Sequence, residues 1–499
     1  MSSNWYFQSR RKISPFFALF PPRIISGDAL HEVIDDRYER VLVLYENGCY
    51  QFFMDEPSQQ RIGEKLFERI RREPQFLRRL TTDVDHHGKR LLAASRRFLD
   101  GDLENRPLSA LRRIFHRYRE AYNAMFARGV IAVLVDRPLI GHLQQVLSRH
   151  VSNDSERFAE MFTMLSTSSD VNWHLKEEEQ LRSIARRGLK DPAFGRAIAA
   201  GGMTPQGLAS FPDVAAAAEH HHKRFGWLPH DYEGTSWALD DILARCIEYA
   251  GATGPRPVSV RQRVKTITQT QRAILERFPI ASEDAALFEA LRYCVYLKHF
   301  RKNFDVRACL GLDRFFDALA ARTMLPRDAL LALSPEEIES LLGGATFGAD
   351  ELLERRTRSA FITTNGTTEA LTGSAAEPWF AEASVERDMP QEGMVKGLTA
   401  SPGRGQGPAR IVLDPQALKN IKEGDVMVVM DVLPEYLSVL RRCRALVADG
   451  GATITSHVAT IAREVGLPAL VGALNASRIF KDGVPIEVNA TEGYAKIVA

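Results

Sequence analysis

The sequence predicts a multidomain protein in which a large, mostly α-helical domain with small β-hairpins is followed by a compact α/β domain. From about 58 to 358 the chain is rich in Leu, Ala, Arg and Glu, and its apolar residues recur at helical spacing. Beyond about 392 the pattern changes to short β runs with helical stretches among them. At 499 residues the chain is also too long for one ordinary core, so we expect about two to four domains.

Two β-hairpins are predicted on either side of the helical region. Apolar residues alternate around Asn47-Gly48, and again around Asn365-Gly366. The Asn-Gly pair readily adopts the positive φ angles of a type I′ turn. Between the hairpins, the clearest helix opens at Ser282 with two acidic residues in its first turn and continues past Arg307. Its length predicts a central structural element.

The stretch from about 373 to 392 is polar and lacks periodicity, so we interpret it as a linker. It would separate a helical domain, 1–372, from a C-terminal domain, 393–499. Within the C-terminal domain, strands are predicted at 409–413, 426–429, 445–448, 469–471, 486–488 and 495–498, and helices at 433–441 and 457–465.

Composition and charge exclude several classes of protein. Apolar residues make up 45% of the chain and charged residues 26%, which is typical of a globular protein. Lys and Arg number 65 against 63 Asp and Glu, so no overall field favours nucleic acid or a membrane surface as partner. The five cysteines are scattered without metal-ligand spacing. The N-terminal apolar stretch is interrupted by prolines and resembles neither a signal peptide nor a membrane span. We expect a cytoplasmic protein without a metal site of its own.

The segment from 449 to 469 has the residue pattern of an anion-binding turn. A predicted strand ends at Gly450-Gly451, a pair that lets the backbone turn sharply and approach a ligand closely. Thr455 or Ser456 then caps a helix that closes at Gly466. His457 is therefore expected in the first helical turn.

That position suits a phosphoryl acceptor. Free N–H groups and the dipole at a helix N-terminus favour an anion such as phosphate, and the same field disfavours imidazolium. A neutral His457 would keep a lone pair for attack on phosphorus. The hydroxyls of Thr453, Thr455 and Ser456 could donate to phosphate oxygens, and Arg463 could offset charge if it faces inward. The alternative interpretation is a polar residue near a helix start, with the glycines serving only the turn.

The same segment resembles the motif of the PEP-utilising enzyme mobile domain, a phosphohistidine swivelling domain. In that family Gly-Gly, a spacer, Thr-Ser-His, Ala, Ala-Arg-Glu, Gly, Pro-Ala and Val-Gly recur in this order. The resemblance implies a β/β/α swivelling fold over about 390 to 499 and a phosphoryl group carried on His457, although Val458 replaces the family's usual Ala. The segment from Gly397 to Arg410 resembles the domain's opening strand. The matching positions are Gly450, Gly451, Thr455, Ser456, His457, Ala459, Ala462, Arg463, Glu464, Gly466, Pro468, Ala469 and Val471-Gly472.

Full-length members such as PEP synthase and pyruvate phosphate dikinase add an ATP-grasp domain and a PEP-binding barrel. We find neither pattern here, because 58 to 358 is predicted as helix after helix and the sequence ends at Ala499. Pyruvate is therefore not the expected acceptor. The arrangement resembles rifampicin phosphotransferase, whose helical domain binds the acceptor, and phenylphosphate synthase, whose nucleotide-binding part is a separate polypeptide. The resemblance implies a separate ATP-grasp partner protein, with Mg²⁺ at the charging and transfer steps.

Two groups of residues in the helical domain are candidates for the acceptor side. Lys298, Arg301 and Lys302 lie within about one turn of the long helix and could neutralise a transferred phosphoryl group, although a solvated basic face explains them equally well. His220, His221 and His222 could include a general base. Consecutive helical residues point in different directions, so we do not expect these histidines to form a metal cage.

The sequence thus predicts the phosphohistidine component of a dikinase-type phosphotransferase. The phosphoryl group would pass from ATP, held by the partner, through His457 to a small-molecule acceptor. The alternative function is a phosphoryl carrier or regulatory protein without a small-molecule acceptor. The identity of the acceptor stays open.

Overall fold

The chain forms two compact units, seen here in a computed structural model. It describes residues 4–99, 102–151, 154–170, 173–252, 259–383, 393–432, 436–451 and 453–498. One unit comprises residues 1–167 together with 274–499, and the other comprises residues 168–273. Each unit is described by itself below.

A five-stranded antiparallel sheet unites both predicted hairpins. Both hairpins are confirmed, with φ angles of 49° and 84° at Asn47 and Gly48 and of 50° and 74° at Asn365 and Gly366. The two hairpins pair with each other through β2 and β4, and a further strand that the sequence analysis missed, β1, pairs with β3. The strand order is β1-β3-β2-β4-β5. The bounds are β1 Trp5–Lys12, β2 Arg40–Glu46, β3 Cys49–Asp55, β4 Arg358–Thr364 and β5 Thr367–Thr372.

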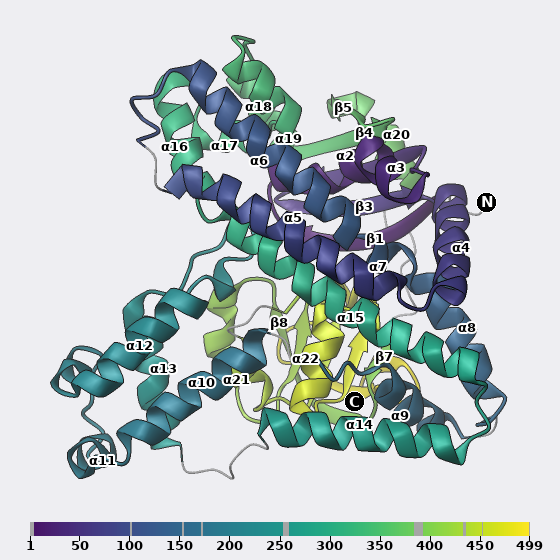
Figure 1. Cartoon of the computed structure of the whole chain (residues 1–499), viewed down its shortest axis with the longest axis vertical. Helices are drawn as coiled ribbons and strands as arrows, with labels where there is room; N and C mark the ends of the chain where they lie inside the picture. Colours follow the sequence, from purple (N-terminus) through teal and green to yellow (C-terminus); the bar gives the residue numbers. More distant parts are fainter. Residues whose placement is uncertain are drawn as a thin grey trace. The chain divides into compact units, whose positions relative to one another are not determined.

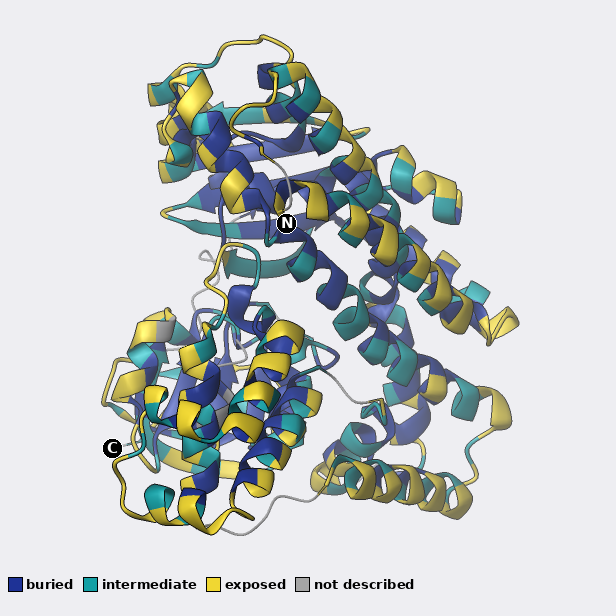
Figure 2. Ribbon diagram, turned by 60° about the vertical axis from the view of Figure 1, so that its left-hand side comes forward, coloured by how far each residue is buried: buried dark blue, intermediate teal, exposed yellow. Residues whose placement is uncertain are grey.

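Helices of the first unit pack around this sheet and around the long helix predicted from Ser282 (Figure 1). That helix, α15, is confirmed over Ser282–Cys309 and packs on α5, α6 and α8. Figure 2 shows the strands buried and the outer helix faces exposed. The helices are α1 Pro15–Ala18, α2 Phe20–Ser26, α3 Asp28–Ile34, α4 Glu56–Arg72, α5 Phe76–Leu99, α6 Leu108–Gly129, α7 Ile131–Leu134, α8 Asp136–Ser148, α9 Ser155–Ser166, α15, α16 Leu312–Thr323, α17 Arg327–Leu330, α18 Pro335–Leu342 and α19 Ala349–Thr357.

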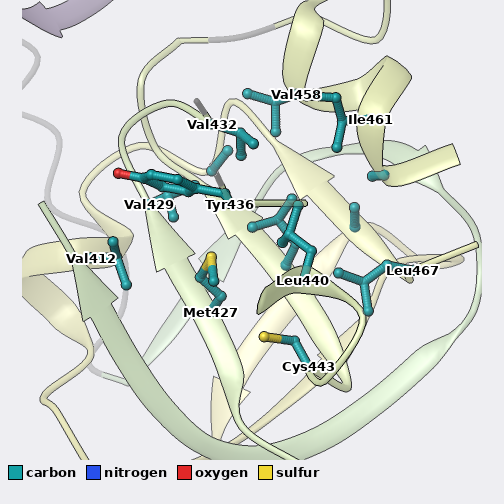
Figure 3. Close-up of a cluster of buried hydrophobic side chains, with 14 of the residues drawn as sticks. Val412, Met427, Val429, Val432, Tyr436, Leu440, Cys443, Val458, Ile461 and Leu467 are labelled. Atoms are coloured by element: carbon teal, nitrogen blue, oxygen red, sulfur yellow. The ribbon is translucent and has the colours of Figure 1, made fainter. Parts of the chain in front are cut away.

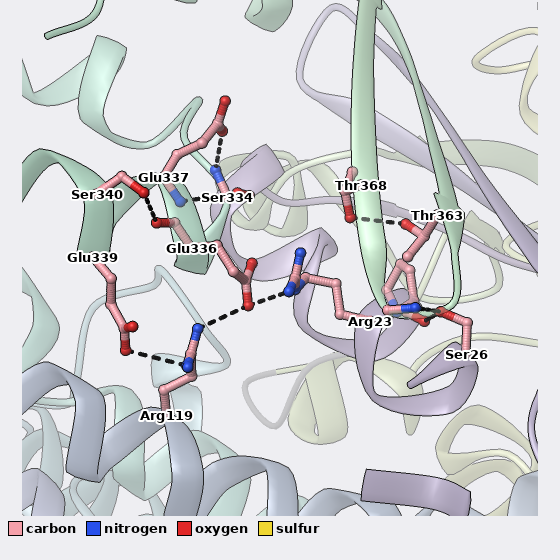
Figure 4. Close-up of polar contacts among 12 residues, drawn as sticks. Arg23, Ser26, Arg119, Ser334, Glu336, Glu337, Glu339, Ser340, Thr363 and Thr368 are labelled. Atoms are coloured by element: carbon pink, nitrogen blue, oxygen red, sulfur yellow. Dashed lines mark hydrogen bonds and ion pairs between the residues drawn. The ribbon is translucent and has the colours of Figure 1, made fainter. Parts of the chain in front are cut away.

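A network of ion pairs ties three of these helices together (Figure 4). Glu336 on α18 accepts from Arg23 on α2 at 2.5 Å and from Arg119 on α6 at 3.1 Å, and Arg119 also pairs with Glu339 at 3.2 Å. Burial raises the pKa of Glu336 even though the two arginines oppose that effect. The network therefore joins segments distant in sequence at a partly desolvated position.

The unit formed by 168–273 is a small helical bundle with its own apolar core. Leu181, Phe194 and Cys246 are among the fully buried residues of that core. The unit ends within α14. Its elements are α10 Trp173–Gly188, α11 Pro192–Ala199, the 3₁₀ turn η1 Gln206–Ser210, α12 Pro212–Phe225, η2 Leu228–His230, α13 Leu239–Gly251 and α14 Val260–Arg277.

The C-terminal segment forms an eight-stranded mixed sheet with the order β6-β13-β12-β8-β9-β10-β11-β7. Strands β8 to β11 are parallel, and α22 packs on them through Val458 and Ile461, which join the core cluster around Met427 and Leu440 (Figure 3). Every strand predicted here is present within a few residues. The elements are β6 Met394–Lys396, β7 Leu398–Ser401, β8 Arg404–Val412, η5 Pro415–Asn420, β9 Val426–Val429, α21 Leu437–Leu440, β10 Ala445–Ala448, α22 His457–Val465, β11 Ala469–Val471, α23 Ala476–Ile479, β12 Pro485–Asn489 and β13 Tyr494–Ile497.

The segment predicted as a linker, 373–392, is partly ordered. Its first part forms the 3₁₀ turn η3 Gly373–Ala375 and helix α20 Glu377–Ala383, because Phe380 and Ala383 bury apolar surface against the N-terminal sheet cluster. The remainder, 384–392, lies outside the described residues. Within the part of the chain that the structure describes, no helix is both long and apolar enough to span a membrane.

Candidate phosphoryl-acceptor site

The predicted turn and helix around His457 are confirmed. Strand β10 ends at Ala448, and Gly451 follows with a φ of 80°, a backbone conformation that a side chain would strain. Ser456 is the N-cap of α22, and its hydroxyl accepts from the Ala459 N–H at 3.2 Å. His457 is therefore the first residue of the helix, where backbone N–H groups favour an anion.

The glycine pair lets this turn lie close to the backbone at Met430 and to strand β1. A Cβ at Gly450 would lie 2.1 Å from the carbonyl oxygen of Met430, so no larger residue fits. The Gly450 carbonyl accepts from the Arg10 N–H of β1 at 2.8 Å, and a Cβ at Gly451 would lie 2.5 Å from the Phe7 ring. The close approach predicted for this turn is thus made to strand β1. Its contact with phosphate stays a prediction.

A buried carboxylate, Asp136 at the start of α8, gathers the polar groups beside the turn. Its Oδ2 atom accepts from the Thr455 hydroxyl at 2.6 Å and from the Thr453 hydroxyl at 3.2 Å. The ammonium of Lys298 forms an ion pair with the same oxygen and donates to Thr455 at 2.5 Å. Asp136 and Thr455 are 4% and 0% exposed. Three donors predicted for phosphate or acceptor chemistry therefore converge on one anion, and they are arranged to hold negative charge.

His457 itself touches a second histidine. Its Nδ1 atom lies 3.0 Å from Nδ1 of His299 on α15, and the ring centroids are 5.0 Å apart. The Nε2 atom of His299 lies 3.0 Å from the hydroxyl of Thr460, one turn along α22. Both rings are half-buried, so His457 is held without being sealed in the core.

Arg463 points to a neighbouring strand. Its Nε donates to the Ala400 carbonyl of β7 at 2.6 Å, and its Nη2 atom is buried without a hydrogen-bond partner among the described residues. Burial lowers the pKa of Arg463 to about 10, so it remains a cation at neutral pH. Residues six apart on a helix do not share a face, which separates this guanidinium from His457. Its predicted role in offsetting phosphate charge stays a prediction.

Of the basic residues predicted on α15, Lys298 reaches the site. Arg301 instead pairs with buried Asp305 at 3.2 Å and lies over the Phe126 ring at 4.5 Å, so its contacts are within the helical part. Lys302 is half-buried on the same helix. The basic cluster is therefore divided between the site and the packing of α15.

The three consecutive histidines lie on α12 and point in different directions, as expected for a helix. His220 is exposed, and His222 contacts the Trp237 carbonyl at 2.8 Å. His221 is fully buried with Nε2 3.0 Å from Glu177, which also binds Arg245 at 2.6 Å. Burial alone would raise the pKa of Glu177, but hydrogen bonds from His221 and Arg245 outweigh it and lower the pKa. His221 thus belongs to a structural network of its own bundle.

Replacing Glu177 with Gln is expected to destabilise the bundle by about 3 kcal/mol, because it leaves the Arg245 charge partly buried without its partner. Since the pKa of Glu177 is lowered on folding, its stabilising contribution is present above the pKa of the unfolded chain and is lost as pH falls through the lower folded value. Three of the five tryptophans lie in this unit, so tryptophan fluorescence during urea unfolding would measure the loss. An unchanged midpoint would contradict the assigned role, and Glu276→Gln, outside this unit, is the matched control.

Sequence analysis missed two residues of the site. Asp136 lies more than three hundred residues before His457, and no local pattern marks it. His299 is next to the predicted Lys298, and a search for titratable neighbours of that lysine would have found it. Among the described residues, no group of three or more His, Cys, Asp or Glu side chains is arranged to hold a metal ion.

The C-terminal segment matches a known family. Residues 421–493 match the model described as PEP-utilising enzyme, mobile domain. The match confirms the resemblance to the mobile domain of PEP-utilising enzymes that the motif predicted for this part of the chain.

Curated relatives extend this similarity. A probable phosphoenolpyruvate synthase from Staphylothermus marinus is 38% identical over 102 residues, which cover 20% of this chain and 12% of that protein. Rifampicin phosphotransferase from Bacillus cereus is 35% identical over 150 residues, 30% of this chain and 16% of that protein. Rifampicin phosphotransferase from Streptomyces sviceus is 32% identical over 190 residues, 36% of this chain and 20% of that protein.

The matched share of this chain is smaller for the PEP synthase than for the two rifampicin phosphotransferases. The matched segments make up a fifth or less of the length of each of these three relatives. The match to the Streptomyces sviceus protein covers a larger share of this chain than residues 393–499 do, so that similarity continues upstream into the helical part. A solved structure of Thermococcus kodakaraensis aconitase X covers 21% of this chain and 98% of its own, with 18% identity and a TM-score of 0.18, which supports no conclusion.

Proposed function

We propose that this protein is the phosphohistidine component of a dikinase-type phosphotransferase. It would relay a phosphoryl group from ATP, bound by a separate ATP-grasp protein, through His457 to a small-molecule acceptor. The observation that carries the proposal is the place of His457, as first residue of α22 after a glycine turn, within the segment that matches the mobile-domain family. The matched relatives are PEP synthases and phosphotransferases, which supports phosphotransferase activity by a histidine-carrying domain.

The chemistry follows from the geometry of the site. A neutral imidazole at a helix N-terminus can attack the β-phosphorus of ATP, so that an N–P bond forms, the P–O bond to AMP breaks and the ring carries the β- and γ-phosphoryl groups together. Attack of water on the γ-phosphorus then breaks the β–γ P–O bond, releases inorganic phosphate and leaves the β-phosphoryl group on the ring. The phosphoryl group then passes to a hydroxyl of the acceptor. Lys298 supplies a cation at this site, which would neutralise charge on the phosphoryl oxygens during transfer.

The helical part is proposed to hold the acceptor. Two observations support this: Lys298 and His299 of α15 contact the segment that carries His457, and the similarity to one rifampicin phosphotransferase extends upstream of residue 393. Rotation of the mobile domain between donor and acceptor, through the segment 373–392, is part of the same proposal.

The expected Mg²⁺ does not fit the residues around His457. The carboxylate brought to the site, that of Asp136, is already engaged by Lys298 and two threonine hydroxyls. We therefore place Mg²⁺ with the polyphosphate of ATP on the partner protein, where its charge would be needed.

The proposal is tested by finding which phosphorus atom of ATP is transferred to the chain. The full chain is incubated with its ATP-grasp partner and Mg²⁺, using ATP labelled with ³²P at the β position in one reaction and at the γ position in another. After the reaction is complete, we expect acid-labile label on the chain from β-labelled ATP, whereas the label of γ-labelled ATP is released as inorganic phosphate. Label from the γ position that stays on the chain without label from the β position would contradict dikinase-type transfer, and absence of label from both would contradict the proposed function.

A further inference from the structure

Three contacts connect His457 to His299 and back to α22. Nδ1 of His457 meets Nδ1 of His299 at 3.0 Å, and Nε2 of His299 meets the Thr460 hydroxyl at 3.0 Å. The Thr460 hydroxyl also lies 3.1 Å from the Ser456 carbonyl, one helical turn back. Each imidazole has two distinct nitrogens, and in a neutral ring only one of them carries a proton. The contacts therefore decide where the protons lie.

The assignment starts at the carbonyl, which can only accept. The single hydroxyl hydrogen of Thr460 is directed to the Ser456 carbonyl, so the Thr460 oxygen must accept from Nε2–H of His299. With that ring neutral, its Nδ1 atom has the lone pair and accepts from Nδ1–H of His457. The lone pair of a neutral His457 is then on Nε2.

We propose that His299 is a positioning residue that fixes His457 as the Nδ1-protonated tautomer and keeps that proton in place while a phosphoryl group enters and leaves Nε2. This inference rests on the proposed function and adds to it the residue that sets the protonation state of the carrier. It assigns the role to α15, the helix that also supplies Lys298.

The proton balance shows why the contact matters. When Nε2 attacks, an N–P bond forms, the P–O bond to the leaving group breaks, and the ring gains positive charge that the Nδ1–H···Nδ1 hydrogen bond stabilises. On transfer, a P–O bond to the acceptor hydroxyl forms and the electron pair of the N–P bond returns to Nε2. The hydroxyl proton passes to water. Because His457 has kept its Nδ1 proton, it departs as a neutral imidazole rather than as an imidazolate anion, which is a far poorer leaving group.

The test uses the purified full chain and phosphoramidate, a small phosphoryl donor that needs no partner protein. Tandem mass spectrometry measures the phosphate on His457, and ³¹P NMR distinguishes its Nδ1 and Nε2 isomers. We expect the wild-type chain to give the Nε2 isomer alone. In His299→Leu we expect formation to slow about 10-fold or more and the Nδ1 isomer to appear, because a hydrogen bond to a charged group is lost.

A conservative variant separates positioning from packing. In His299→Asn the side-chain carbonyl can accept near the place of Nδ1, so we expect the Nε2 isomer alone and a rate within about 3-fold of wild type. Thr460→Val removes the group that directs the tautomer of His299, so the Nδ1 isomer is expected again, whereas Thr460→Ser restores the wild-type result. If His299→Leu gives the wild-type isomer at the wild-type rate, the role of His299 is wrong.

A second measurement tests the role of His299 without phosphorylating the chain. In the chain labelled with ¹⁵N-histidine, nitrogen shifts report which ring nitrogen of His457 is protonated, and the His457→Asn variant assigns the signal. We expect Nδ1 protonation in wild type and in His299→Asn, and a change in His299→Leu. Nε2 protonation of His457 in wild type would overturn the inference. Absence of label from ATP and the partner protein on a wild-type chain that has the expected tautomer would instead contradict the proposed function alone.

Discussion

The His457→Asn variant is expected to retain less than about 1% of the wild-type phosphoryl label when incubated with ATP and the proposed ATP-grasp partner. An amide has no lone pair basic enough to attack phosphorus, whereas its polar atoms can still reach Nδ1 of His299 across the contact of 3.0 Å. The ring is half-buried at the start of α22, so the helix cap at Ser456 and the core beneath it remain. Label is measured on the intact chain at alkaline pH.

The control for this variant is His31→Asn, on α3, whose ring is about half exposed and pairs with Asp35. It makes the same chemical change in another helix, and we expect full labelling. Circular dichroism of both variants should match wild type. Substantial label on His457→Asn would mean that another residue accepts the phosphoryl group, and the assignment of the carrier would be wrong.

The Lys298→Met variant is expected to be charged from ATP but to transfer the phosphoryl group to its acceptor about 10²–10³-fold more slowly. The Lys298 side chain is only 13% exposed and its ammonium meets Asp136 and Thr455, so its charge acts in a poorly solvated place. Methionine keeps the length of the side chain and removes the charge. Loss of label from the charged chain after addition of the acceptor, followed by rapid quench, measures the rate.

Two further variants show whether the charge of Lys298 is responsible for the transfer rate. Lys298→Arg retains the charge and should recover most of the loss, although its planar group fits a site for ammonium imperfectly. Lys89→Met changes an exposed lysine on α5 and should leave transfer unchanged. A normal transfer rate in Lys298→Met would show that the lysine serves only to neutralise buried Asp136.

Local pattern was enough to predict much of the C-terminal domain. The strands at 426–429, 445–448 and 469–471 have the predicted bounds, because each is a short, fully apolar run between turn residues. The helix at 457–465 has the bounds predicted from its cap and its closing glycine. The two Asn-Gly hairpins were predicted for the same reason: their signals lie within a dozen residues.

Features that depend on distant residues were not predicted. Strand β1 is mostly polar and basic, and it is recognised as a strand only through its pairing with β3. The union of the two hairpins into one sheet joins residues about 320 apart, as in the pairing of Val41 with Thr363. Asp136 likewise contacts Thr455, and His299 contacts His457, through the packing of α8 and α15, which no spacing in the sequence encodes. Local chemistry marked His457 as the candidate carrier, and tertiary packing supplied its surroundings.

The most direct measurement of the central claim is the location of the phosphoryl group after charging. The wild-type chain is incubated with ATP, Mg²⁺ and the ATP-grasp partner, digested at alkaline pH, and the peptide spanning α22 is sequenced by tandem mass spectrometry. We predict a single phosphate on His457. Phosphate on His299, on Thr453 or Thr455, or on any peptide that lacks His457 would contradict the account.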